Sequence, residues 1–311
     1  MNFPLGKQAM NFKIVLFFHL AVCFAFPQSE KTDSNAVFFL SDCQQPLFVE
    51  KLSLRAYRNE EGRDSLFFDI IRQRPRCLFL LGDLTAAGSK RKKWQPINAF
   101  LFTLRKDNCS VYAIPGNHEY MVNAKKGIKN FIKSFGRQQT LGYCVKRGSL
   151  AIVMLNSNFN HIPSADFNWQ QNWYLAEMDS LDKDSTIKSI LIGTHHPPYT
   201  NSSAVGPSKR VEQDFVPRFE KSPKARLFLS GHSHNLEYFN SSSGKQYMVI
   251  GGGGGLAQPL LPEDKRWYID QLPQIKKPLF FYIIITVGGE SLSIEIRGLD
   301  KNFNAMRYSL P

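Results

Sequence analysis

The chain has 311 residues, 43% of them hydrophobic, which is enough to bury a substantial core and fits one large catalytic domain rather than several. Its net charge of +13 and pI near 9.5 predict attraction to anions: phosphorylated substrates, nucleic acid or anionic lipid surfaces. The densest basic run, Lys90 to Lys93, has no interleaved aromatic residues and no nucleic-acid-binding motif. We therefore interpret it as a solvated loop or helix start and predict no nucleic-acid partner.

The N-terminal segment has the pattern of a secretory signal. A lysine precedes an apolar run over residues 14–26, which is short for a membrane span and suits the core of a signal peptide. We predict a signal peptide over residues 1–25, a catalytic domain over residues 26–311, and a secreted or periplasmic protein without a stable membrane span. Leu20 to Cys23 has features of a bacterial lipoprotein signal, but Val22 stands where a small residue is expected, so a lipid anchor is the weaker alternative.

Short apolar runs alternate with amphipathic segments in the first half of the chain, which is typical of a mainly parallel sheet covered by helices. The predicted strands there are Val37–Leu40, Cys77–Leu81 and Val111–Ile114, with helices over Ser65–Gln73 and Ile97–Lys106. The predicted elements of the second half are strands Gly142–Val145, Leu150–Leu155, Ser189–Ile192, Arg226–Leu229 and Tyr247–Ile250, and a helix over Trp169–Ser180.

The chain ends in two longer apolar runs, Leu279–Val287 and Ser291–Ile296, which the intervening Gly288-Gly289-Glu290 predicts to be a β-hairpin. Two mixed sheets packed face to face with helices outside accommodate all of these elements. We therefore expect an α/β fold, a four-layer α/β/β/α sandwich.

Four cysteines follow the predicted signal, and none forms a C-x-x-C pair, which argues against a zinc ribbon. They are Cys43, Cys77, Cys109 and Cys144. An export compartment would permit a disulfide, but the sequence establishes no pairing.

Five consecutive glycines, Gly251 to Gly255, follow the predicted strand Tyr247–Ile250. No Gly-Lys-Ser/Thr comes after them, so they are not a P-loop. A flexible linker and a close approach of the backbone to a neighbouring site are the two remaining interpretations.

Five of the seven histidines lie in three short phrases at the ends of apolar runs, which indicates a metal site. The phrases are Gly116-Asn117-His118-Glu119, Thr194-His195-His196-Pro197-Pro198 and Gly231-His232-Ser233-His234. Asp42 and Asp83 also follow predicted buried strands, where open α/β sheets place their ligands. In an extended backbone His232 and His234 point the same way, so each can reach a different one of two adjacent metals. The carboxylate of Asp83 can bridge both ions, and Asn117 and Asp42 offer further oxygens. Together with the histidine nitrogens they form a mixed N/O ligand set suited to Mn, Fe or Zn.

In this order the phrases resemble the motifs of the calcineurin-like metallophosphoesterase family: D-x-H, G-D, G-N-H-E, a later H, and G-H-x-H, here from Asp42 to His234. The resemblance implies two divalent metal ions. The first would be held by Asp42, Gln44, Asp83 and His234. The second would be held by Asp83, Asn117, His195 and His232, with Asp83 bridging.

The resemblance also implies roles beside the metals. His118 would face the substrate and stabilise or protonate the departing oxygen. His196 competes with His195 for the second metal, and we favour His195 because the family ligand is generally the first of such a pair. Glu119 can orient His118 or bind a neighbouring amide.

The sequence departs from the family at Gln44, which stands where histidine is usual. In this it resembles D-x-Q branches such as manganese-dependent ADP-ribose/CDP-alcohol diphosphatase-like enzymes, and an amide oxygen favours harder ions such as Mn. The stretch from His195 to Ser203 resembles the purple acid phosphatases, which have a tyrosine ligand three residues after the bridging aspartate. Ala86 occupies that position, so we expect a divalent pair rather than a purple ferric centre.

Together these features predict a metal-dependent phosphoesterase, acting on a small phosphorylated substrate through hydroxide activated between two metals. Our first hypothesis is a phosphatase of phosphomonoesters. A phosphodiesterase or pyrophosphatase for nucleotide or lipid-linked diphosphates is the second, which Gln44 favours. A non-catalytic metal-binding relative is the third, and the oligomeric state stays open.

Overall fold

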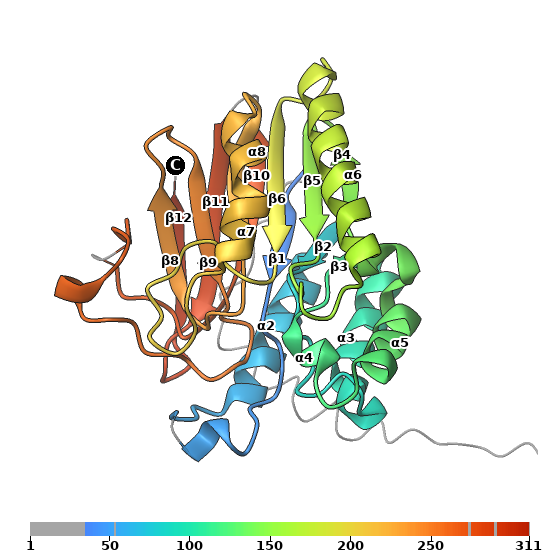
Figure 1. Cartoon of the computed structure of the whole chain (residues 1–311). Coiled ribbons are helices and arrows are strands. Elements are labelled where there is room, and N and C mark those ends of the chain that lie inside the picture. Colours follow the sequence, from blue (N-terminus) through green and yellow to red (C-terminus); the bar gives the residue numbers. More distant parts are fainter. Residues whose placement is uncertain (1–34, 53, 273–274, 289–290, 311) are drawn as a thin grey trace, which may run out of the picture.

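Two six-stranded mixed sheets form the centre of the computed structural model (Figure 1). The structure describes residues 35–310 except 53, 273–274 and 289–290, so the predicted signal peptide lies outside the described residues. The first sheet has the order β12-β11-β10-β1-β2-β3 and the second β4-β5-β6-β7-β9-β8.

The first sheet joins the N-terminal parallel strands to the C-terminal hairpin. Its strands are β1 (Val37–Leu40), β2 (Cys77–Leu80), β3 (Ser110–Ala113), β10 (Phe280–Gly288), β11 (Ser291–Leu299) and β12 (Ala305–Leu310). β1, β2 and β3 run parallel, while β10 pairs antiparallel with both β1 and β11. The predicted hairpin is thus confirmed, since Gly288 pairs with Ser291.

The second sheet contains the remaining strands. They are β4 (Tyr143–Arg147), β5 (Leu150–Leu155), β6 (Ser189–Thr194), β7 (Ala225–Ser230), β8 (Leu236–Asn240) and β9 (Gln246–Ile250). β5, β6, β7 and β9 are parallel, and β4 and β8 close the two edges in antiparallel pairing.

Helices cover the outer face of each sheet (Figure 1). Those on the first sheet are α2 (Asn59–Gln73), α3 (Gln95–Lys106) and α5 (Ala124–Phe135); those on the second are α6 (Ser164–Lys183), α7 (Lys209–Asp214) and α8 (Val216–Lys221). The short α4 (Asn117–Tyr120) and the 3-10 turns Glu50–Leu52, Arg91–Trp94, Arg137–Thr140 and Glu263–Lys265 lie in the connections.

Three apolar layers hold these parts together, which confirms the predicted four-layer sandwich. One lies between the two sheets and includes Phe39, Phe79, Met154 and Ile283. The other two join each sheet to its own helices. Because β1, β2, β5 and β6 are apolar on both faces, each can pack against helices on one side and the opposing sheet on the other.

Two further observations bear on the sequence predictions. Cys43, Cys77, Cys109 and Cys144 all have free thiols. Within the part of the chain that the structure describes, no helix is long and apolar enough to cross a bilayer.

Candidate metal centre

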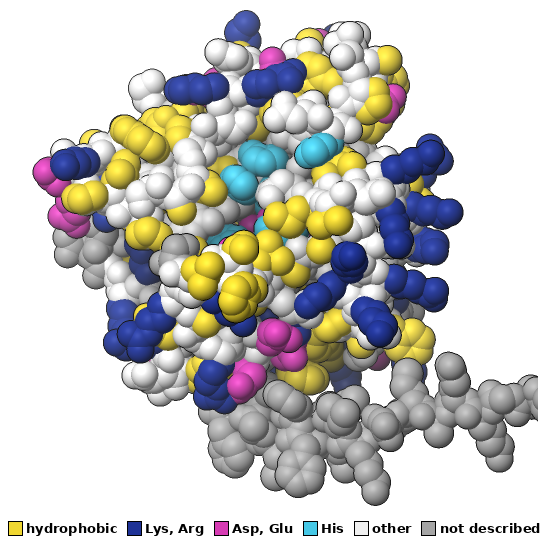
Figure 2. Space-filling model, turned by 60° about the horizontal axis from the view of Figure 1, so that its bottom comes forward, with side chains coloured by type: hydrophobic (Ala, Val, Ile, Leu, Met, Phe, Trp, Pro, Cys, Tyr) yellow, Lys and Arg dark blue, Asp and Glu magenta, His cyan; other side chains and the backbone are white. Residues whose placement is uncertain are grey.

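The predicted site residues gather at the carboxyl ends of parallel strands from both sheets. Asp42 follows β1, Asp83 follows β2, and Asn117 begins α4 after β3. His195 follows β6, and the His232 and His234 pair follows β7. Figure 2 shows histidine side chains gathered in the middle of this face.

The backbone turns sharply at three of these positions. Asp42, Asp83 and His232 have φ values of 60°, 51° and 65°, in the left-handed region that residues other than glycine seldom adopt. Each such residue costs about 1–2 kcal/mol relative to ordinary backbone. The chain therefore changes direction just after β1, β2 and β7.

A first group of acceptors converges around His234. Its Nδ1 lies 2.7 Å from the Leu256 carbonyl oxygen and donates to it, so Nε2 carries the lone pair when the ring is neutral. That Nε2 lies 3.4 Å from Oδ1 of Asp42. Burial lowers the pKa of His234, but the hydrogen bond and charge of Asp42 outweigh burial and raise it. Positive charge is therefore favoured between these two side chains.

Gln44 completes this group. Its amide finds partners in one orientation, in which the nitrogen donates to the backbone oxygens of Asp83 at 3.0 Å and Asp42 at 3.1 Å. The amide oxygen then lies 3.0 Å from Nε2 of His234. The side chain is buried, and both donor hydrogens are used, so only the oxygen is available to a ligand.

A second group of acceptors converges around His195. Its Nδ1 donates to the Leu81 carbonyl oxygen at 2.9 Å, and its Nε2 lies 3.0 Å from Oδ1 of Asn117 and 3.3 Å from Oδ2 of Asp83. Burial alone would lower the pKa of His195, yet the charge and hydrogen bond of Asp83 raise it to about 9. Burial, together with the charge of His195, lowers the pKa of His232 to about 4, which keeps that imidazole neutral.

Two overlapping triads of side chains in these groups and beside them have the spacing of metal ligands. Ligand atoms of Asp42, Asp83 and His195 lie within 4.8 Å of one another, and so do those of His195, His196 and His232. Buried oxygen and nitrogen lone pairs that face one another repel unless a proton or cation lies between them. Carboxylate, amide oxygen and neutral imidazole are the donors that Mn, Fe and Zn accept.

His118 lies beside the carboxylate of Asp83 without being part of either group. Its backbone N–H donates to Oδ1 of Asp83 at 2.8 Å, and its ring Nδ1 lies 3.0 Å from the Ala86 carbonyl oxygen. The Nδ1 proton is held by that oxygen. Nε2, 3.8 Å from Oδ2 of Asp83, is left to face the site.

Residues 37–236 match the family model of the calcineurin-like phosphoesterases. The chain belongs to this family.

Individual relatives give a consistent picture of the fold. Purple acid phosphatase 7 of Arabidopsis thaliana is 22% identical over 179 residues, which is 51% of this chain and 54% of the relative. The chain thus spans about half the length of this curated relative. A purple acid phosphatase from yellow lupin (Lupinus luteus) seeds superposes with a TM-score of 0.67 at 14% identity, over 91% of this chain and 54% of that one. A dimetal phosphatase from Danio rerio gives 0.58 at 14% identity, over 89% and 99%.

Membership of this family is consistent with the gathering of candidate metal ligands described above. At the position expected for a tyrosine ligand this chain has the buried methyl group of Ala86, which offers no oxygen. The backbone of Ala86 has another task here, because its carbonyl oxygen holds the ring of His118.

Glu119 resolves the alternative left open by the sequence. This fully buried carboxylate accepts three backbone N–H groups: Asp83 at 2.9 Å, Leu84 at 3.0 Å and Gly116 at 2.8 Å. It therefore binds neighbouring amides and ties the loop after β2 to the loop after β3. Burial, followed by the charge of Asp83, raises the pKa of Glu119 to about 7.

The five-glycine run approaches the site closely and is not a loose linker. The N–H groups of Gly253 and Gly255 donate to the carbonyl oxygens of Ser41 and Asp42, both at 2.9 Å. A Cβ on Gly255 would lie 2.4 Å from the ring of His234. Asn59 fixes the run from the other side by donating to the carbonyl oxygens of Gly254 and Gly255.

His196 lies against the same centre. Its ring centroid is 4.5 Å from that of His232, and its Nδ1 lies 2.8 Å from the hydroxyl of Ser157. Ser157 also accepts the His196 backbone N–H at 2.9 Å, so one hydroxyl orients the whole residue. Sequence reasoning missed Ser157, and its only signal is its position just after strand β5.

Proposed function

We propose that this metallophosphoesterase hydrolyses phosphomonoesters with two divalent metal ions, held as the ligand pattern implies. Asp42, Gln44, Asp83 and His234 would hold the first ion. Asp83, Asn117, His195 and His232 would hold the second. The observation that carries this proposal is the convergence of acceptor atoms around Nε2 of His234 and Nε2 of His195, each ring having its Nδ1 proton held by a backbone oxygen.

The chemistry that such a pair supplies is Lewis acidity toward phosphate oxygens and a water of lowered pKa. The residues of the chain position this chemistry. Asp83, its loop held by Glu119, would lie between the two ions. In its doubly protonated form His118 would give the Nε2 proton to the leaving oxygen, while the Nδ1 proton stays with the Ala86 carbonyl oxygen and the ring is left neutral.

A phosphodiesterase or pyrophosphatase acting on ADP-ribose-like diphosphates is the second candidate, supported by Gln44 alone. The test is the protein with added Mn on three substrates: p-nitrophenyl phosphate, bis(p-nitrophenyl) phosphate and ADP-ribose. We expect kcat/KM for the monoester to exceed the other two at least tenfold. Preference for ADP-ribose would establish the second candidate, and fewer than one metal per chain with no activity would leave a non-catalytic relative.

Measuring the metal content of variants tests whether Gln44 is a metal ligand. With both of its N–H groups donated to backbone oxygens, its amide oxygen should act as a ligand, and Gln44→Ala should lose one ion per chain while Gln44→His keeps two. Gln45→Ala removes the same amide one residue later and serves as the matched control, with two ions expected. Full occupancy of Gln44→Ala in mass-spectrometric metal analysis would remove Gln44 from the ligand set.

The role of His118 is tested by leaving groups. A general acid contributes roughly 10²–10⁴-fold, and this help matters most when the leaving oxygen is strongly basic. We expect His118→Asn to lower kcat about 100-fold or more for glycerol phosphate but far less for p-nitrophenyl phosphate. The exposed His161, replaced by Asn, is the control and should alter neither rate.

We also propose that the protein is exported, on the strength of its N-terminal sequence alone, and that its substrate is a small phosphorylated molecule rather than nucleic acid. N-terminal sequencing of the mature protein from the culture medium or periplasm tests the first statement. A mature chain that begins at Met1 or Met10 inside the cell would contradict it.

A further inference from the structure

The positive charge of the protein is concentrated in one short part of the chain. Residues 87–141 contain eleven lysines and arginines but two acidic residues, a net charge of +9 out of +13 for the whole sequence. One of the two acidic residues, Glu119, is buried beneath the metal centre. All eleven cationic side chains are exposed, and we call them the basic face: Lys90, Arg91, Lys92, Lys93, Arg105, Lys106, Lys125, Lys126, Lys129, Lys133 and Arg137.

Among the residues that the structure describes, no member of the basic face forms an ion pair with a carboxylate. Elsewhere on the surface pairing is common, as for Lys146 with Asp184, Lys209 with Glu212 and Arg218 with Asp182. Unpaired like charges on adjacent helices repel one another, so an anion that covers them is favoured.

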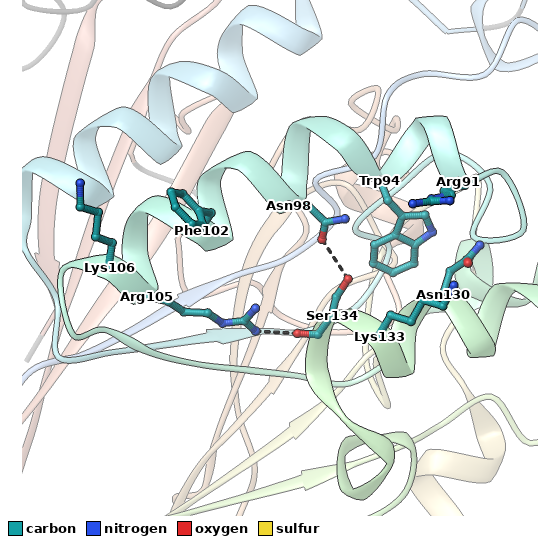
Figure 3. Close-up of a pocket in the computed structure, with 9 residues that line it drawn as sticks. All are labelled: Arg91, Trp94, Asn98, Phe102, Arg105, Lys106, Asn130, Lys133 and Ser134. Atoms are coloured by element: carbon teal, nitrogen blue, oxygen red, sulfur yellow. Dashed lines mark hydrogen bonds between the residues drawn. The ribbon is translucent and has the colours of Figure 1, made fainter. Parts of the chain in front are cut away.

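A groove of about 680 Å³ lies within this face, between α3 and α5 (Figure 3). Its cations are Arg91, Arg105, Lys106 and Lys133, and no carboxylate is among the described residues that line it. The walls are held in place by hydrogen bonds across the two helices: Arg105 donates to the Ser134 carbonyl oxygen at 2.7 Å, and the Ser134 hydroxyl donates to Asn98 at 2.9 Å. The groove is therefore a formed feature of the fold.

Phe102 decides between the polyanions that suit such a face. Of the described residues that line the groove, it is the one aromatic residue that is largely exposed, at 71%, and it stands among the cations of α3. Single-stranded nucleic acid is typically bound by successive aromatic platforms, which are missing here. A basic surface with a single exposed apolar side chain suits a bilayer, where cations meet headgroups and the ring enters the boundary with the acyl chains.

We propose that the basic face docks the protein on an anionic lipid surface, with the α3–α5 groove taking a phosphate-bearing headgroup. Figure 2 shows the lysines and arginines gathered beside the face that carries the histidines, on the side where α3 and α5 lie in Figure 1. Docking through the basic face would hold the metal centre close to the membrane surface. The inference does not depend on catalysis, since no residue of the basic face belongs to the proposed metal centre.

The test is co-sedimentation of the protein with phosphatidylcholine vesicles, with and without 30% phosphatidylserine, in chelator so that the metal centre takes no part. We expect at least tenfold preference for the anionic vesicles, falling as NaCl rises from 50 to 200 mM because salt screens the attraction. Each basic residue near an anionic bilayer contributes about fivefold to partitioning. The double variant Arg91→Gln/Lys133→Gln should therefore bind about 25-fold more weakly.

The matched control is Lys183→Gln/Lys188→Gln, which removes the same charge from two exposed positions, the last residue of α6 and the residue before β6. Binding of this control to the anionic vesicles should weaken less than threefold. Binding of Phe102→Ser should weaken about twofold to fivefold without any change of charge. Equal losses in the two double variants would overturn the proposal, because net charge alone would then explain binding. Equal binding to neutral vesicles, or displacement from the vesicles by an equal charge of single-stranded DNA, would overturn it as well.

Discussion

Glu119 offers the sharpest test of how the metal centre is built. Its Oε2 accepts the N–H groups of Asp83 and Gly116, and its Oε1 accepts that of Leu84. Glu119→Gln keeps the shape but supplies one acceptor oxygen instead of two. With the amide oxygen at the Oε2 position, the new NH2 group faces the N–H of Leu84, and a buried donor loses its partner.

The magnitude follows from these contacts. A buried N–H without an acceptor costs about 1–3 kcal/mol, and the two bonds that remain each lose about 1 kcal/mol on becoming neutral. Removing a carboxylate next to Asp83 relieves some repulsion, the same repulsion that helps burial raise the pKa of Glu119. We expect the free energy of unfolding to fall by about 2–3 kcal/mol, and Tm by about 3–5 °C.

A second effect should appear at the metals. Glu119 touches neither proposed ion, so it acts as a positioning residue for the loops of Asp83 and Asn117. Displacement of reacting groups by about 1 Å can cost about 100-fold in rate. Glu119→Gln should therefore lose metal and at least tenfold in kcat/KM at temperatures where it is still folded.

Urea unfolding, Tm by calorimetry and metal analysis on the same samples make the test. Glu263→Gln changes the same group where the side chain is 83% exposed, and it should stay within about 0.5 kcal/mol of the parent protein. If Glu119→Gln unfolds at the parent temperature with full metal content, the three backbone contacts do not hold the site and our reasoning is refuted.

Three further predictions each concern a single residue. Gly255→Ala would bring a Cβ to 2.4 Å from the ring of His234 and should reduce metal content. Gly206→Ala, with open space around it, should not. Equal metal content of the two variants by mass spectrometry would contradict this. Val122 is 78% exposed at φ 67°, so Val122→Gly should raise Tm by about 1–3 °C, and a fall in calorimetry would show that the turn needs the side chain. Burial raises the pKa of Glu237 from 4.5, so this group favours folding below pH 4.5 and loses that contribution as pH rises. In urea unfolding between pH 4 and 7, Glu237→Gln should flatten the slope of the unfolding free energy against pH. An unchanged slope would count against this role.

The interior strands were predictable because their burial pattern is local in the sequence. A strand buried on both faces is mainly apolar, and β1, β2, β5 and the middle of β6 show this pattern in the sequence. Edge strands carry a weaker signal. β12 alternates between exposed and half-buried residues and β8 begins only two residues after His234, and neither was predicted.

Other omissions were readable in the sequence. α5 carries Ile128, Phe131, Ile132 and Phe135 at helical spacing, and its Asn123 side chain accepts the N–H of Lys126 as an N-cap. α4, α7 and α8 are too short for a periodic pattern. The concentration of charge in residues 87–141 could also have been counted, but that the cations share one face depends on how α3 and α5 pack.

The site residues were predictable by type, whereas the support that holds them was not. The role of Glu119 depends on two loops, one after β2 and one after β3, meeting around one carboxylate. The orientation of the Gln44 amide depends on backbone oxygens of Asp83 and Asp42 that no spacing reveals. The contacts of Glu119 and Gln44 with Asp83 join segments that are far apart in the chain, so only the folded structure contains the information.

The same contacts explain why the strained backbone persists. Asp42, Asp83 and His232 would each be more stable at negative φ, by about 1–2 kcal/mol. Each is held by its neighbours instead: the N–H of Asp42 donates to Gly82, that of Asp83 to Glu119, and that of His232 to the carboxylate of Asp42. A fold selected for stability alone would relax these turns, because the strain contributes nothing to packing. Three proposed ligands have strained backbones, and each is held by a separate hydrogen bond. The placement of the donor atoms therefore takes precedence over a low backbone conformational energy at this site.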